Sequence, residues 1–348
     1  MSTLKIKDDL VLGEGQPCWV VAEIGLCHNG DLATAKQMIV ASARAGADVV
    51  KFQKRDVANL AIGPVLDAPD DRFPTFGSTY RQVRNHIEFD LEQYKELQQT
   101  AREAGVELFA SVFDIKSASE MAALEMPLIK VASHCLSNKP LIDHLCDLGL
   151  PLLLSTGMAY WEEIDETVEA LTKANIQFGL YHCVSSYPHT YETANLSLIT
   201  RMKKRYGVPV GYSSHELDNQ SAFLATALGA FSIEKHVTLA RQQEGFDHGI
   251  AQDMAGLKDL VDGVRRAECA LGNGEKSVSA EEMVTRNKYH CSVVAAQQIS
   301  AGETISSSML TTKNPGTGIA AREIDSVVGR IARQPIESDT LIAWDMLE

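Results

Sequence analysis

The chain has 348 residues, of which 45% are hydrophobic and 22% charged, a composition that is typical of a folded globular protein and excludes extended disorder. Its formal net charge of −14 argues against nucleic acid and anionic membranes as partners. No apolar run is long enough to span a membrane, and the N-terminal segment lacks the apolar core of a signal peptide. Seven cysteines without a CxxC pair fit reduced thiols, so we expect a cytoplasmic protein.

Apolar, β-rich runs alternate with amphipathic segments through the first three quarters of the chain. Near-continuous hydrophobic runs are typical of parallel strands that are covered on both faces. Helices are predicted over 32–45 and 91–104, because each segment has helical apolar spacing and ends at a glycine. The pattern predicts a (β/α)₈ barrel, with an open doubly wound sheet as the alternative. The predicted strands are residues 19–25, 48–53, 107–112, 128–133, 151–157, 178–184, 209–215 and 232–237.

Three further segments complete the predicted organisation. Residues 4–12 are expected to form a short hairpin that closes the bottom of the barrel. The long stretch 54–89 lacks periodicity, and such a segment after a barrel strand usually carries function or covers a site. After the turn-rich break at 272–276, the short segments are mostly β in character. We therefore predict a catalytic barrel over residues 1–280 and a small cap domain over 281–348.

Polar side chains recur where the predicted strands end, which is where barrel enzymes place their chemistry. Two of them, Lys51 and Lys130, lie within apolar strands, and a buried lysine requires an anionic partner. That partner is either an anionic ligand, such as a phosphate or carboxylate, or an internal acid such as Glu23. The convergent set is Glu23, Lys51, Gln53, Ser111, Lys130, Ser133, Ser155, Tyr187, His215 and His236.

Two histidines end the seventh and eighth predicted strands, which are neighbours in a closed barrel. A lone histidine is more often structural, but two imidazoles at adjacent strand ends favour a divalent metal on His215 and His236. Asp247, in the following loop, is positioned to add an oxygen. Cys183 falls inside a predicted strand and is expected in the core.

Motifs at residues 20–25, 28–30, 46–53, 129–133, 154–158, 182–188, 211–215 and 234–236 occur in a characteristic order and spacing. Together they resemble the sialic acid synthase family, which includes N-acetylneuraminate, pseudaminate and legionaminate synthases and spore coat polysaccharide synthase-like members. The tail from about His290 is similar to that family's antifreeze-like (SAF, β-clip) domain. The resemblance implies condensation of phosphoenolpyruvate with an aldose, such as N-acetylmannosamine, to give a 3-deoxy-2-keto acid and phosphate.

The resemblance also implies roles for the convergent residues. A Mn²⁺ or Mg²⁺ ion on His215 and His236 would polarise the aldehyde, and Glu23 and Asp247 would serve sugar hydroxyls and proton transfer. A homodimer is implied, in which the small domain of one chain caps the barrel of the other. Phosphoenolpyruvate would lie against Lys51, Gln53, Ser111, Lys130, Ser133, Ser155, Ser185 and Tyr187.

The sequence departs from the family pattern on the sugar side. Cys27 takes the first position of an Asn-x-His-x-Gly motif, ahead of His28; Cys135, after His134, replaces an acid; and Asn314 replaces an arginine. These changes predict a less polar acceptor pocket and poor use of N-acetylmannosamine. One alternative is a non-catalytic sugar-binding or regulatory relative. Another is a barrel synthase that uses a sugar phosphate, with the extra positive charge supplied by Arg55, Arg72 and Arg81.

Overall fold

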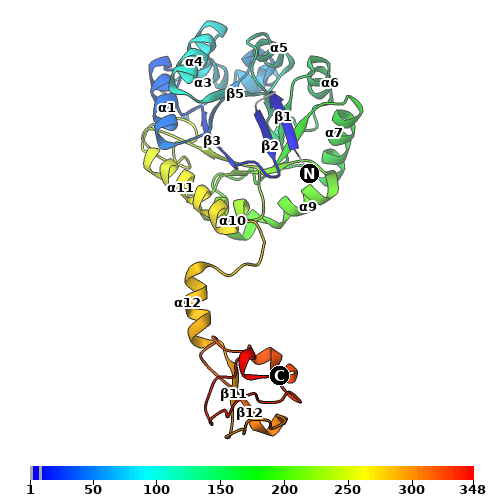
Figure 1. Ribbon diagram of the computed structural model, residues 1–348. Helices are drawn as coiled ribbons and strands as arrows, with labels where there is room; N and C mark the ends of the chain where they lie inside the picture. The colour runs from blue at the N-terminus through cyan, green and yellow to red at the C-terminus, as the bar shows by residue number, and fades with distance from the viewer. Residues whose placement is uncertain (1–2, 8–9) are drawn as a thin grey trace. The chain divides into compact units, whose positions relative to one another are not determined.

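A computed structural model describes residues 3–7 and 10–348, which divide into a barrel unit, Met1–Gly272, and a C-terminal unit, Asn273–Glu348. Within the described residues of the barrel unit, eight parallel strands close into a barrel in sequence order, with β10 paired to β3 (Figure 1). The closed barrel confirms the predicted fold. Its strands are β3 (Trp19–Gly25), β4 (Val49–Lys54), β5 (Glu107–Val112), β6 (Ile129–Val131), β7 (Leu152–Ser155), β8 (Phe178–Cys183), β9 (Val210–Ser214) and β10 (Ser232–His236).

Helices surround the barrel, and their ends follow from local sequence. In α1 (Leu32–Ala45), the Asp31 side chain accepts from the Thr34 N–H, and Gly46 ends the helix at φ 93°. In α4 (Leu91–Ala104), Asp90 and Gln93 form a capping box before the helix stops at Gly105. Both predicted helices are therefore confirmed. The others are α5 (Ile115–Ala123), α6 (Lys139–Leu148), α7 (Trp161–Lys173), α8 (Tyr191–Ala194), α9 (Ser197–Tyr206), α10 (Gln220–Ala227) and α11 (Met254–Leu271).

The predicted N-terminal hairpin is present and closes the amino end of the barrel. Strands β1 (Thr3–Lys7) and β2 (Leu10–Gly13) pair antiparallel. The hairpin buries Leu4, Ile6 and Leu12 in one hydrophobic cluster with Trp19 and Phe231. Trp19 begins β3 and Phe231 directly precedes β10. This apolar seal leaves the carboxyl ends of the strands as the end available for a ligand.

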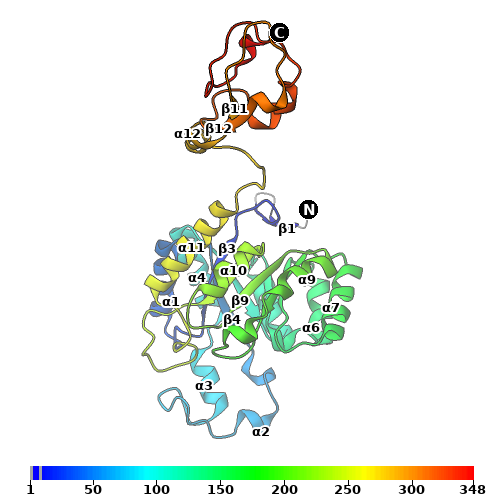
Figure 2. The same ribbon diagram turned by 90° about the horizontal axis from the view of Figure 1, so that it is seen from below.

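The long segment after β4 folds at that other end. It contains a short 3₁₀ turn (Val57–Asn59), α2 (Gly63–Leu66) and α3 (Tyr80–Ile87). Figure 2 shows α2 and α3 projecting from the end of the barrel opposite to β1. The Thr79 hydroxyl caps α3 by accepting from the Gln82 N–H. The segment thus lies beside the strand ends, where residues of a site are expected.

The C-terminal unit begins with α12 (Ala280–Tyr289), which the sequence analysis had not predicted, although Ser279 and Glu282 form its capping box. Two antiparallel strands follow, β11 (Ser292–Ala295) and β12 (Leu310–Lys313). Isolated β-bridges connect the remaining segments around a small apolar core. Across the described part of the chain, no helix has the length and hydropathy needed to cross a membrane.

Candidate active site

A cavity of about 280 Å³ opens at the carboxyl end of the barrel strands. Every strand of the barrel, or the loop that follows it, contributes at least one lining residue. The structure brings together most of the residues predicted from the sequence: Glu23, Lys51, Gln53, Ser111, Lys130, Ser133, His134, Ser155, Ser185, Tyr187, His215, His236 and Asp247. Glu234, Arg55 and Arg84 also line it.

Two lysines and two glutamates form a buried quartet on the cavity floor. Lys51 Nζ lies 2.9 Å from Glu23 Oε2 and 3.3 Å from Glu234 Oε1, and Lys130 Nζ lies 2.8 Å from Glu234 Oε2. All four side chains are buried. Of the two partners considered for the buried lysines, an anionic ligand or an internal acid, the structure shows internal acids for both. These acids are Glu23 and Glu234. The quartet is formally neutral, so the floor can hold charge without a ligand.

Electrostatics within the quartet favour the ionised glutamate. Although burial opposes it, the ammonium groups of Lys130 and Lys51 hold the pKa of Glu234 well below its usual range. Burial lowers the pKa of Lys130, whose Nζ also lies 4.1 Å from the centre of the Tyr181 ring. Because Glu234 and His236 are two residues apart on one strand, their side chains point to the same barrel face. That alternation was the signal in the sequence that could have identified Glu234.

Three serine hydroxyls form a cradle in the cavity that the lysines also line. Gly157 N–H donates to Ser133 Oγ at 3.2 Å, and Ser155 and Ser185 line the same part of the cavity. A Cβ on Gly157 would lie 2.3 Å from Ser185 Oγ and 2.9 Å from Ser133 Oγ. The close approach therefore needs glycine, and this donor set suits the oxygens of a phosphate group.

His215 and His236 face one another with ring centroids 5.4 Å apart. His215 Nδ1 lies 2.8 Å from the Val184 carbonyl oxygen, so Nδ1 carries the proton and Nε2 keeps a free lone pair. His236 Nδ1 is buried without a hydrogen-bond partner, 3.6 Å from Asp247 Oδ2. Burial lowers the pKa of both imidazoles, which favours the neutral form that binds metals.

This pair of imidazoles fits a divalent ion, because the buried His236 Nδ1 has no hydrogen-bond partner and is available as a ligand. The described residues contain no group of three or more histidine, cysteine, aspartate or glutamate side chains in a ligand arrangement. An ion at this position would therefore be held by His215 and His236 and completed by water or substrate oxygens. Tyr187 stacks against the pair, with its ring centroid 4.0 Å from that of His215.

Only some of the sugar-side residues predicted from the sequence line the cavity. His134 lines the cavity, whereas Cys27, His28 and Cys135 lie behind its wall. Cys27 Sγ is 3.5 Å from the Phe246 carbonyl oxygen, and Cys135 Sγ is 3.7 Å from that of Phe113. Burial raises the pKa of the Cys135 thiol to about 11, so it stays protonated. The two thiols thus contact the aromatic wall of the cavity from outside.

His28 and Asn314 occupy other environments. His28 stacks on Phe89 with ring centroids 4.3 Å apart, and burial lowers the pKa of His28 to about 3. Asn314 directly follows β12 in the C-terminal unit. Among the arginines considered from the sequence, Arg72 pairs with Asp70 and Arg81 pairs with Asp67, and neither lines the cavity. Arg84 was missed because it lies on α3, in the segment that shows no clear periodicity in sequence.

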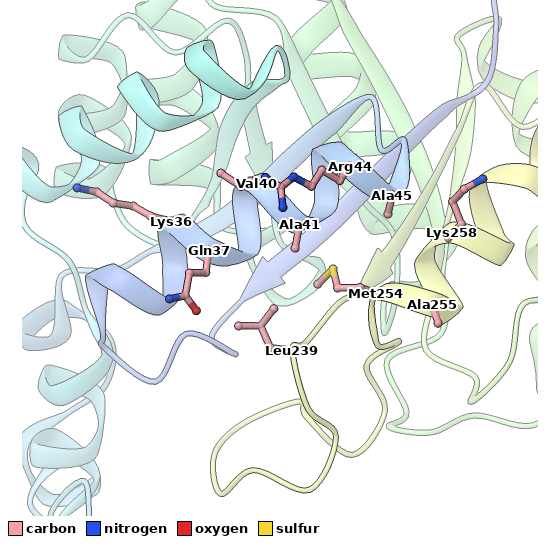
Figure 3. A pocket seen from close by; sticks show the side chains of 10 residues that line it. All are labelled: Lys36, Gln37, Val40, Ala41, Arg44, Ala45, Leu239, Met254, Ala255 and Lys258. Carbon is pink, nitrogen blue, oxygen red and sulfur yellow. The ribbon is translucent and has the colours of Figure 1, made fainter.

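Figure 3 shows a larger hollow, of about 770 Å³, on the outer helical layer between α1 and the start of α11. Its centre is lined by apolar side chains such as Leu239 and Met254, and Lys36 and Lys258 lie toward its ends. Both lysines pair with acids on the helix surface. The described residues that line the hollow include no acid, histidine or cysteine, so the strand-end cavity is the better candidate for chemistry.

Comparison with known proteins agrees with this geometry. Mus musculus N-acetylneuraminate-9-phosphate synthase is 34% identical over 97% of this chain and 94% of its own. Legionella pneumophila N,N'-diacetyllegionaminic acid synthase is 32% identical over 100% and 99%. The solved structure of N-acetylneuraminic acid (sialic acid) synthetase from Leptospira borgpetersenii, in complex with citrate, aligns with a TM-score of 0.72 at 32% identity, covering 82% of this chain and 95% of that one.

The family comparison matches the two units separately. Residues 38–276 match the NeuB family and residues 291–348 match the SAF domain. The first match covers more than half of the chain, and full-length relatives exceed 30% identity. The resemblance inferred from the sequence motifs is thereby confirmed, and the chain belongs to the NeuB family of sialic acid-type synthases, with a SAF domain at its C-terminal end.

Proposed function

We propose that this protein condenses phosphoenolpyruvate with an aldose to form a sialic-acid-like 3-deoxy-2-keto acid, with release of phosphate. The observation that carries the proposal is the serine cradle, formed by Ser133, Ser155 and Ser185, in a cavity that two buried lysines also line. A small ligand that carries both a phosphate and a carboxylate matches these two sets of donors. Kinship to sialic acid-type synthases supports the same reaction class.

In the proposed pose, the phosphate lies on the serine cradle and the carboxylate lies toward the lysines. Lys51 Nζ donates to Ser111 Oγ at 2.8 Å, which holds both groups in one orientation. Because Glu23 and Glu234 already neutralise the lysines, the ligand carboxylate would share their ammonium donors. The serine hydroxyls then supply most of the phosphate contacts.

The reaction forms a carbon–carbon bond at C3 and a carbon–oxygen bond from water at C2, and it breaks the carbon–oxygen bond between C2 and the phosphate. C3 of phosphoenolpyruvate attacks the aldehyde carbon of the open-chain sugar, and the aldehyde oxygen takes up a proton. Water adds at C2, and the C2–O bond to the phosphate then breaks, leaving the keto acid and inorganic phosphate. Glu23 and Asp247, which both line the cavity, are the candidates for proton transfer and for sugar hydroxyl contacts.

A bound Mn²⁺ or Mg²⁺ ion would polarise the aldehyde oxygen as a Lewis acid. His215 and His236 would hold that ion, since both present neutral imidazoles to the cavity. Tyr187 packs against both rings and would keep them in place. We also propose that the protein is a homodimer; light scattering on the full-length chain would test this directly.

A phosphate-release assay with phosphoenolpyruvate, Mn²⁺ and a panel of aldoses tests the proposal. Replacing Lys51 with methionine keeps the stem but removes the cation, and should weaken phosphoenolpyruvate binding by about 2–5 kcal/mol. Replacing Lys139, an exposed lysine that pairs with Asp143 on α6, is the matched control and should change nothing.

Two results would contradict the proposal, one the function and the other the binding pose. Sugar binding with no release of phosphate from phosphoenolpyruvate, whichever aldose is added, would favour the non-catalytic relative. Unchanged phosphoenolpyruvate affinity in the Lys51→Met variant would reject the proposed pose. Calorimetric titration with phosphoenolpyruvate alone separates a failure of binding from a failure of turnover.

A further inference from the structure

One side of the cavity carries positive charge that the structure leaves incompletely paired. We call this side the basic flank and define it as Arg55, Arg84 and His134, all of which line the cavity. Arg55, at the end of β4, is 6% exposed, and its guanidinium lies 3.8 Å from the centre of the Phe113 ring. Arg84 reaches in from α3 and lies over the Phe246 ring at 4.5 Å.

Several guanidinium donors of the basic flank have no acceptor among the described residues. Arg84 Nε and Nη1 and Arg55 Nη1 are buried without a hydrogen-bond partner. Arg55 pairs with Glu88, whose Oε1 lies 3.5 Å from Arg55 Nη1 and is itself without a hydrogen-bond partner. Leaving a buried donor unsatisfied costs about 1–3 kcal/mol, and more for a charged group. These orphaned donors therefore indicate that a ligand group completes this side of the cavity.

The rest of the cavity differs from the basic flank in charge. On the floor, Lys51 and Lys130 are matched one for one by glutamates. On the flank, Arg55 pairs with Glu88, and burial raises the pKa of that carboxyl. Asp247 acts electrostatically on Arg55 and Asp70 interacts with Arg84, but neither carboxylate satisfies the orphaned guanidinium nitrogens. Burial together with the two arginines lowers the pKa of His134, which keeps that ring neutral. Three guanidinium nitrogens of the flank therefore remain available to donate to an anionic group such as a carboxylate or phosphate.

The position of the flank relates this charge to the acceptor. In the serine cradle, Ser133 and Ser185 follow β6 and β8 and Ser155 ends β7. His215 directly follows β9, and His236 ends β10. Arg55 and Arg84 lie beyond β4, on the segment that folds at the carboxyl end of the barrel. A sugar with its aldehyde at the histidines and its far end toward β4 would place that far end against the guanidiniums.

We infer that the acceptor aldose carries an anionic group, remote from its aldehyde, that is bound by Arg55 and Arg84. The inference rests on the proposed condensation and specifies the class of its second substrate. It differs from the expectation of a less polar acceptor pocket, because the two cysteines behind that expectation lie outside the cavity lining. Relatives with names for phosphorylated and for unphosphorylated products both match the chain, so kinship alone does not select the acceptor class.

The test compares acceptors that differ only at the remote end, in the phosphate-release assay on the full-length protein. The three arms are a neutral N-acylhexosamine, its 6-phosphate and the corresponding uronic acid. We expect roughly 100-fold or higher kcat/KM for one of the two anionic sugars over the neutral sugar. The arm that gains identifies a phosphate or a carboxylate as the group that is bound.

Variants assign the effect to the flank. Arg84→Gln and Arg55→Gln should each raise the KM for the anionic acceptor by roughly 10-fold or more, with the KM for phosphoenolpyruvate unchanged. Arg81→Gln is the matched control, because Arg81 is paired with Asp67 and does not line the cavity. Thermal unfolding of each variant checks that the fold is retained.

Two results would overturn the inference: equal use of neutral and anionic sugars, or a rise in the phosphoenolpyruvate KM in place of the acceptor KM. Calorimetry with the sugar 6-phosphate and the uronic acid, without phosphoenolpyruvate, keeps the inference separate from the proposed reaction. Arginine-dependent binding of either anion supports the inference even if no sugar is turned over. Absence of binding by both anions rejects it, whatever the reaction proves to be.

Discussion

Replacing Glu234 with glutamine tests how strongly the buried quartet depends on its shared acid. The change keeps the shape of the side chain but leaves Lys130 without an anionic partner, while Lys51 keeps Glu23 at 2.9 Å. Removing one partner of a buried ion pair costs about 3–5 kcal/mol. Lys130 could instead lose its proton, which at pH 7, roughly 3.5 units below the ordinary pKa of lysine, costs about 5 kcal/mol. The loss of stability caused by the unpaired charge therefore cannot greatly exceed that value.

The expected result is therefore a loss of about 3–5 kcal/mol in the free energy of unfolding of the barrel unit. For a unit of this size, that corresponds to roughly 6–20 °C in Tm by scanning calorimetry. Glu107→Gln is the control, because Glu107 forms a half-exposed pair with Lys7 and should cost less than about 1 kcal/mol.

A double variant separates the lost charge balance from other effects of the substitution. Glu234→Gln combined with Lys130→Met removes both members of the pair and should recover a large part of the stability lost by the single change. A single variant as stable as the wild type, or a double variant no better than the single one, would show that Lys130 does not depend on Glu234.

Three other predictions follow from the site. Gly157→Ala should weaken phosphoenolpyruvate binding by about 1–3 kcal/mol in calorimetry, since its Cβ would meet Ser185 Oγ at 2.3 Å; unchanged affinity would contradict the cradle. His236→Ala should abolish stoichiometric Mn²⁺ binding measured by titration, whereas retention of the ion would remove His215 and His236 as its ligands. Burial lowers the pKa of His28 from 6.5 to about 3, so the stability it contributes is present above pH 6.5 and is lost toward pH 3. Over that range, urea unfolding should show wild-type stability falling more steeply than that of His28→Gln, by up to about 1.4 kcal/mol per pH unit; parallel curves would contradict the burial effect.

Much of the barrel was predictable because its signals are local. The bounds of β3, β5, α1 and α4 agree with the predicted segments, since apolar runs and terminal glycines mark them clearly. The strand predicted over 128–133 is shorter, as β6 is Ile129–Val131 and the chain turns into a 3₁₀ helix at Ser133. A continuous apolar pattern cannot show where pairing stops, because the hydrogen bonds of the ladder depend on the neighbouring strands.

Site residues at strand ends could be predicted from the sequence. Site residues whose position depends on packing between distant segments could not. Glu23, Lys51 and His215 converge because the barrel places every strand end at one rim. Cys27 lies two residues after β3 and Cys135 four residues after β6, and whether a side chain there faces the cavity depends on the turn that follows the strand. Arg84 could not be inferred from local pattern, because its position depends on how α3 folds toward the barrel.

The division between floor and flank has a consequence for how such an enzyme can diversify. The floor quartet lies on β-strands that are each hydrogen-bonded to a neighbour on both sides of the closed barrel. A change in the register of one of these strands would therefore disturb the pairing of several others. Arg55 and Arg84 belong instead to the segment between β4 and α4, which carries only short helices outside the barrel ladder. Insertions and substitutions in that segment can accumulate at little cost to folding. Under the proposed function, acceptor preference would therefore change through exchange of this segment, while the residues proposed for bond formation stay fixed in the barrel.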